Sequence, residues 1–244
     1  MNTENGRLML AGLRIETVRK NIKNIHLGVY PPNGRVRVAA PFRITDEELK
    51  LLLVSKLPWI KRQQSKFSNQ ARETPREYVS GESHYLNGER YVLDLSHSGT
   101  QRKVEVRGNR TLVLTVPVNA SIESREKTMD EFYRKELDRN LRETLPKCEK
   151  IVGVRAKEAR IRKMRTKWGT CNPKAERIWI NLELAKKSPK SLEYVVIHEL
   201  VHILEKGHNE RFKKIMDQVL PDWRLYRRNL NAAILSETKW PSVV

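Results

Sequence analysis

The sequence predicts an α+β fold in which a β-rich amino-terminal region with one helix, residues 1–117, precedes a mainly helical region, residues 118–244. In the first region, apolar and polar residues alternate around tight-turn sequences, which is typical of hairpins. In the second, apolar residues mostly recur every three or four positions, which is typical of helices. Strands and helices segregated along the chain in this way favour an α+β over an α/β architecture.

The first elements are expected to be a hairpin and a helix. Residues 13–41 alternate on both sides of the turn sequence Pro-Pro-Asn-Gly at 31–34, which predicts two antiparallel strands. Thr45 and Glu48 have the spacing of a capping box, and a helical apolar pattern follows them. Pro58 is a candidate kink in this helix.

Two further hairpins and a long helix follow a polar linker, which is expected at residues 69–76. The Asn-Gly at 87–88 and the Gly-Asn at 108–109 each separate two apolar runs, which predicts a tight turn in each hairpin. The helix is expected at 121–151, where apolar residues form one stripe. The remaining predicted elements are short strands at 160–165 and 178–181, a turn-rich segment at 169–176 between them, and a last helix at 222–236.

Between these strands and the last helix, the sequence predicts a buried helix and a short corner. Ser188 is a good N-cap, and Pro189 fits the first helical position. Apolar residues cover most sides of the helix, and Gly207 is expected to end it through a positive φ. Asn209 is a plausible cap for a second helix beginning at Glu210.

The buried helix contains the most informative motif of the chain. His198, Glu199 and His202 follow the pattern H-E-x-x-H, and residues four apart lie on one face of a helix. Both imidazoles can therefore bind one zinc ion, with Glu199 beside it as the base that takes a proton from water. The motif indicates a metal-dependent hydrolase with one zinc ion per chain.

A catalytic zinc ion usually has a third protein ligand, and His208 is the main candidate. Its spacing from His202 is that of the metzincins, although Glu205 occupies their usual glycine position. Glu205, Glu210 and Asp217 remain alternative third ligands. A structural zinc site is a further alternative, but the two cysteines, Cys148 and Cys171, are not spaced as a ligand pair. The other histidines, His26, His84 and His97, match no ligand spacing and are expected at the surface or in turns.

The formal net charge is +19, which predicts attraction to polyanions. Lysine and arginine are concentrated from Arg155 to Lys167, opposed there only by Glu158. This segment is either a nucleic-acid-binding patch or a solvated strand face. No apolar run reaches bilayer length, and the amino terminus lacks the pattern of a secretion signal, so we expect a cytoplasmic protein without a membrane partner. No pattern predicts an oligomeric state.

Several of these segments resemble the YgjP-like metallopeptidase family. The family's W-G-S-C element corresponds to residues 168–171, with Thr170 in place of serine, and its strand ending in L-N or similar corresponds to residues 178–182. The pattern Y-V-V-x-H-E-L-x-H corresponds to residues 194–202, and His208 follows as the third histidine. The resemblance extends upstream and covers most of the chain.

The resemblance implies a zincin-like catalytic domain in residues 118–244, a β-rich amino-terminal region, and kinship with SprT-like proteases. It implies that His198, His202 and His208 bind zinc and that Glu199 is the general base. The implied substrate is a peptide or protein, which by analogy would pair with an exposed strand such as Trp179 to Asn181. The alternatives are a zinc hydrolase of a nucleotide or other phosphate-containing small substrate, and a nucleic-acid-associated protein with a structural metal site.

Overall fold

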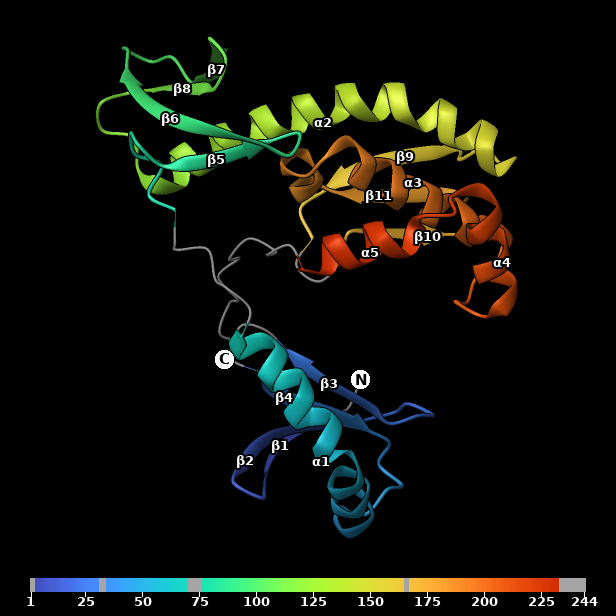
Figure 1. Cartoon of the computed structure of the whole chain (residues 1–244). Helices are drawn as coiled ribbons and strands as arrows, with labels where there is room; N and C mark the ends of the chain where they lie inside the picture. The colour runs from blue at the N-terminus through green and yellow to red at the C-terminus, as the bar shows by residue number, and fades with distance from the viewer. Residues whose placement is uncertain (1–2, 31–33, 70–75, 165–166, 233–244) are drawn as a thin grey trace. The chain divides into compact units, whose positions relative to one another are not determined.

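A computed structural model describes residues 3–30, 34–69, 76–164 and 167–232 (Figure 1). The fold is α+β, as the sequence predicted. The chain divides into two compact units, Met1–Glu73 and Thr74–Val244. No helix among the described residues is long and apolar enough to span a bilayer.

The first unit contains one four-stranded sheet and one helix. The sheet has the order β1-β2-β4-β3. The expected hairpin is formed by β3 and β4, which pair antiparallel with Tyr30 opposite Arg35. The mostly exposed strand β1 was not expected from the sequence. The bounds are β1 Thr3–Leu10, β2 Leu13–Lys20, β3 His26–Tyr30, β4 Arg35–Ala40 and α1 Asp46–Asn69.

Helix α1 begins with the expected capping box. The Thr45 amide donates to Glu48 Oε2 at 2.8 Å, and the Glu48 amide donates to Thr45 Oγ1 at 3.2 Å. Pro58 lies inside the helix and does not end it. Leu49, Leu53 and Ile60 of α1 are fully buried and pack with apolar residues of β2 and β4 in the core of this unit.

The second unit begins with another four-stranded sheet, which has the order β5-β6-β8-β7. Both expected hairpins are present, because β5 pairs antiparallel with β6 and β7 with β8. Leu93, Leu112 and Leu114 of this sheet belong to the same buried core as the H-E-x-x-H helix. The contacts therefore divide the chain after residue 73, rather than at the expected boundary after residue 117. The bounds are β5 Ser83–Leu86, β6 Glu89–His97, β7 Lys103–Arg107 and β8 Thr111–Val116.

The long helix α2, Ile122–Val152, runs along both sheets of this unit (Figure 1). Ser121 caps its first turn, and Gly153 ends it in the left-handed conformation with φ 76°. The second sheet has the order β10-β11-β9, formed by β9 Glu158–Arg162, β10 Gly169–Asn172 and β11 Arg177–Asn181. Strand β10 lies in the segment that the sequence predicted as a turn.

The position of β11 corrects the expected substrate-pairing strand. It pairs in parallel with β9 and antiparallel with β10, so both of its edges are already occupied. Trp179 to Asn181 therefore cannot add a substrate strand. Strand β10 is at the edge of this sheet and has only β11 beside it among the described strands.

The remaining elements are η1 Leu182–Lys186, α3 Pro189–Leu204, α4 Glu210–Val219 and α5 Trp223–Ala232. The Ser188 side chain caps α3, and the Asn209 side chain caps α4, as expected. Helix α3 ends earlier than expected. Glu205 leaves the helix in an extended conformation at φ −140°, and Gly207 has no positive φ. The predicted end of the last helix, at residue 236, lies outside the described residues.

Candidate metal centre

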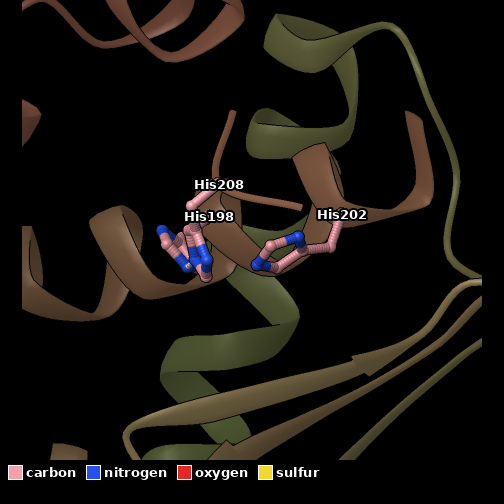
Figure 2. Close-up of side chains that lie close together, drawn as sticks. All are labelled: His198, His202 and His208. Atoms are coloured by element: carbon pink, nitrogen blue, oxygen red, sulfur yellow. Dashed lines mark hydrogen bonds between the residues drawn. The ribbon is translucent and has the colours of Figure 1, made fainter. Parts of the chain in front are cut away.

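Three imidazoles converge at the end of α3 (Figure 2). His198 and His202 lie four residues apart on this helix, and His208 lies in the corner that leads to α4. One ring nitrogen from each of the three histidines lies within 4.8 Å of the other two. The Nε2 atoms of His198 and His208 are 3.0 Å apart. The tertiary structure thus brings all three predicted ligands to one point.

The surroundings of these rings fit a zinc ion. His202 Nδ1 lies 3.0 Å from the carbonyl oxygen of Glu205, which only accepts, so Nδ1 carries the proton and Nε2 keeps its lone pair. Burial, followed by the neighbouring imidazoles of His202 and His208, lowers the pKa of His198 to about 3. Its Nδ1 is buried without a hydrogen-bond partner. Neutral imidazoles with converging lone pairs are the donors that zinc prefers.

The Phe212 ring packs against all three imidazole rings. Its ring centroid lies 5.0, 4.8 and 4.8 Å from those of His198, His202 and His208. The side chain is 1% exposed. Asn209 positions Phe212, because its Oδ1 accepts the Phe212 amide at 3.0 Å in the first turn of α4. The sequence did not predict this packing role, although Phe212 lies four residues after His208 on a capped helix.

The alternative third ligands are engaged elsewhere. Among the described residues, the group that could hold a metal contains only the three histidines. The carboxylates of the alternatives instead form ion pairs with arginine or lysine: Glu205 with Arg211, Glu210 with Lys213, and Asp217 with Arg224.

Glu199 is 5% exposed and lies against the edge strand β10. Burial raises its pKa to about 8, against the opposing positive charge of Lys167. A cation beside this carboxyl would favour its charged form, which is the form that accepts a proton. The charge state of Glu199 therefore depends on whether a positive charge lies beside it.

Gly169 allows this close approach. A Cβ atom at residue 169 would lie 2.6 Å from Glu199 Oε1 and 2.9 Å from Cδ, which are separations that real Cβ atoms essentially never show. The W-G-T-C element therefore needs a glycine at residue 169 because the Glu199 side chain lies so close, and not because of a positive φ. In the same strand, burial raises the pKa of the Cys171 thiol to about 11, and the charge of Glu199 adds to the shift.

Asn181 holds the segment that leads into β10. It is fully buried, and its Nδ2 donates to the carbonyl oxygens of Met164 at 2.9 Å and Lys167 at 2.7 Å. Its Oδ1 accepts the amides of Met164 and Glu183, both at 3.2 Å. The asparagine at the end of β11 thus positions the strand that faces Glu199. In the sequence, the only signal for this role was an asparagine at the end of the predicted strand 178–181.

A cavity of about 670 Å³ opens over the histidines and Glu199. Strand β10 and its flanks form one wall, and residues of α3 and α5 form the others. Besides the histidines and Glu199, its lining residues are Lys167, Trp168, Gly169, Thr170, Cys171, Pro173, Tyr194, Val195, Lys206, Arg227 and Leu230.

His84 has different surroundings from those expected, and several residues of the basic segment contact other parts of the protein. His84 is 4% exposed rather than at the surface, and it contacts Glu82 at 3.2 Å and the Tyr133 hydroxyl at 3.4 Å. In the basic segment, Lys163 binds two carboxylates of α2, whereas the guanidinium groups of Arg160 and Arg162 lie over Trp179, at 5.4 and 6.0 Å from its ring centroid. Residues 165–166 of this segment lie outside the described residues.

Comparison with known proteins gives one family match and a distant structural likeness. The model of a family described as "YgjP-like, metallopeptidase domain" matches residues 23–233. No curated protein matches the sequence. Among solved structures, the metallopeptidase zymogen abylysin of Pyrococcus abyssi is similar at 19% identity and a TM-score of 0.35, over 37% of this chain and 90% of that chain.

Proposed function

Because the chain belongs to the YgjP-like metallopeptidase family, we propose that it is a zinc-dependent peptidase that cleaves peptide bonds by addition of an activated water. The observation that supports this proposal best is the convergence of His198, His202 and His208 beside the buried carboxyl of Glu199. A structural metal site would not need a base at this position. The family match supports the metallopeptidase class, and the donor set supports zinc.

The residues have distinct roles in the proposed reaction. His198, His202 and His208 would hold one zinc ion, which supplies acidification of a coordinated water and polarisation of the scissile carbonyl. Glu199 accepts a proton from the attacking water on a carboxylate oxygen. The same oxygen then donates that proton to the nitrogen of the leaving amine, which regenerates the base. Because Gly169 has no side chain, Glu199 can stay against β10 during both proton transfers.

Strand β10 is the proposed docking edge for the substrate. It lies at the edge of its sheet, and its residues line the cavity above Glu199. An extended peptide can pair with the backbone of such an edge, which holds the scissile bond in a fixed register. Asn181 supports this role because it fixes the segment that enters β10.

Metal analysis combined with a substrate screen tests this proposal. Glu199→Gln preserves the shape of the side chain but cannot accept a proton, so the variant should retain zinc and fold while losing about 10² to 10⁴ in rate. The screen compares peptide pools with nucleotides and other phosphate esters. Wild-type turnover in the Glu199→Gln variant would refute the proposed base. If the protein cleaved phosphate esters but no peptides, it would be the alternative, a zinc hydrolase of phosphate-containing substrates, and not a peptidase.

A further inference from the structure

The wall of the cavity bears three cationic side chains from three separate segments. Lys167 precedes β10, Lys206 lies in the corner between α3 and α4, and Arg227 lies on α5. Glu199 is the only carboxylate among the described residues that line the cavity. No salt bridge within the described part of the chain involves Lys167, Lys206 or Arg227.

The high net charge of the protein does not by itself explain these cations. Many other cationic side chains of this unit are paired, as Lys163 is with Glu126 and Asp130. The contrast is sharpest on α5, where Arg224 pairs with Asp217 and Arg227, one turn later, faces the cavity without an ion pair. Arg228, the other arginine of this helix, also has no ion pair among the described residues, but it does not line the cavity.

The three cations share one cavity with the candidate metal ligands. Lys167, Lys206 and Arg227 line the same cavity as Glu199 and the three histidines. A substrate group bound in this cavity would therefore experience the positive field of these side chains.

We propose that Lys167, Lys206 and Arg227 make the cavity selective for peptides with a carboxylate close to the scissile bond. This inference rests on the proposed peptidase function and names its substrate class. A field of one sign in a concave site favours ligands of the opposite charge and repels those of like charge. A lysine or arginine near the scissile bond is disfavoured for the same reason. The carboxylate belongs either to an aspartate or glutamate side chain or to the end of the peptide.

A set of matched peptides tests the proposal on the zinc-loaded full chain. The peptides share one sequence, in which each position in turn is replaced by Glu, Gln or Lys. All three series have an amidated carboxyl end, and the Gln series is also made with a free carboxyl end. One unit charge about 6 Å away, at an effective dielectric constant of about 40, changes affinity about tenfold. We therefore expect the best Glu peptide, or the peptide with the free end, to be cleaved at least about tenfold faster than its neutral counterpart.

Charge-reversal variants test which cationic residues cause the preference for acidic peptides. By the same estimate, Arg227→Gln should reduce the ratio of acidic to neutral cleavage by about tenfold, because it removes one unit charge. Lys206→Glu and Arg227→Glu each change the charge by two units and should reduce the ratio by up to about 100-fold. Arg228→Glu is the matched control, because Arg228 is an exposed neighbour on α5 that does not line the cavity. Thermal unfolding of each variant verifies that it is folded, and the neutral Arg227→Gln variant replaces any reversal that does not fold.

The outcomes separate this inference from the proposed function. Equal cleavage of Glu and Gln peptides, faster cleavage of Lys peptides, or an unchanged ratio in both reversal variants overturns the inference and leaves the peptidase in place. If no peptide is cleaved faster by wild type than by Glu199→Gln, the proposed function fails. Fluorescence anisotropy of labelled Glu, Gln and Lys peptides with the metal-free protein then decides the inference. Preferential binding of the acidic peptide, lost in Arg227→Glu and kept in Arg228→Glu, supports it, and equal binding refutes it.

Discussion

Replacement of Gly169 by alanine should impair catalysis without loss of metal. The new Cβ would lie 2.6 Å from Glu199 Oε1, 2.7 Å from Cγ and 2.9 Å from Cδ, whereas ordinary van der Waals contact begins at 3.4 Å. The nearest oxygen must therefore move away by roughly 0.8 Å. Glu199 is 5% exposed, so its side chain has little free space for this movement. The backbone at Gly169 has no positive φ, so the effect is one of contact rather than of strain.

The size of the loss follows from this displacement. A misplacement of about 1 Å in a catalytic group can cost about 10²-fold in rate, so we expect kcat/KM of Gly169→Ala to fall about 10- to 100-fold. Overpacking should also destabilise the protein by about 1 to 3 kcal/mol. Zinc content should not change, because the three atoms nearest to the new methyl group all belong to Glu199, which is not a proposed zinc ligand. The assay is cleavage of a peptide pool at several concentrations, with zinc measured on the same samples.

Two comparisons make this prediction refutable. Gly207→Ala adds the same methyl group where nothing lies within 4 Å and should leave kcat/KM unchanged. In the Glu199→Gln background, Gly169→Ala should cause no further loss, because the base that it displaces is already absent. Full activity of the single variant, or an independent additional loss in the double variant, would show that Gly169 does not act through Glu199.

The remaining predictions concern the metal, a buried histidine and the basic segment. His208→Ala should weaken zinc binding by more than about 100-fold, as measured by competition with a chelator. Unchanged affinity would indicate that the third ligand is Glu205, Glu210 or Asp217 instead. Burial, and next the charge of Arg76, lowers the pKa of His84 to about 4 from 6.5, so the unfolded state binds more protons and stability is lost as pH falls from 6.5 to 4. Urea unfolding of the metal-free protein at pH 7 and pH 4 should show this loss, up to about 3 kcal/mol, and His84→Gln should lack it. If the basic segment binds nucleic acid, Arg160→Glu with Arg162→Glu should abolish binding that falls steeply with salt, and flat salt dependence would indicate a solvated face.

Local patterns in the sequence predicted the elements that depend on near neighbours. The capping box of Thr45 and Glu48 formed as expected, because both of its hydrogen bonds span three residues. The tight-turn sequences likewise predicted the β5-β6 and β7-β8 hairpins. By contrast, the sequence did not predict β1, or β10 as a strand, because a strand depends on its pairing partners as well as on its own propensity.

The division of the chain into compact units after residue 73, rather than after residue 117, has a similar reason. The sheet β5-β6-β8-β7 resembles the first unit in its strand-rich composition, and this led to an expected division after residue 117. Its leucines are nevertheless buried in the core that contains α3. Which core receives an apolar face is a long-range property, and alternation along a strand indicates only that one face is buried.

The candidate site combines both kinds of information. The sequence alone determined that His198, Glu199 and His202 share one region of a helix, because the helical repeat of 3.6 residues sets their relative directions. It also identified His208, but only the fold of the corner brought its ring to 3.0 Å from that of His198. Tertiary structure alone decided that Gly169 faces Glu199, that Asn181 supports β10, and that cations from three segments line one cavity. These contacts join residues far apart in the chain, and their geometry depends on how the sheet and α3 pack rather than on any local repeat.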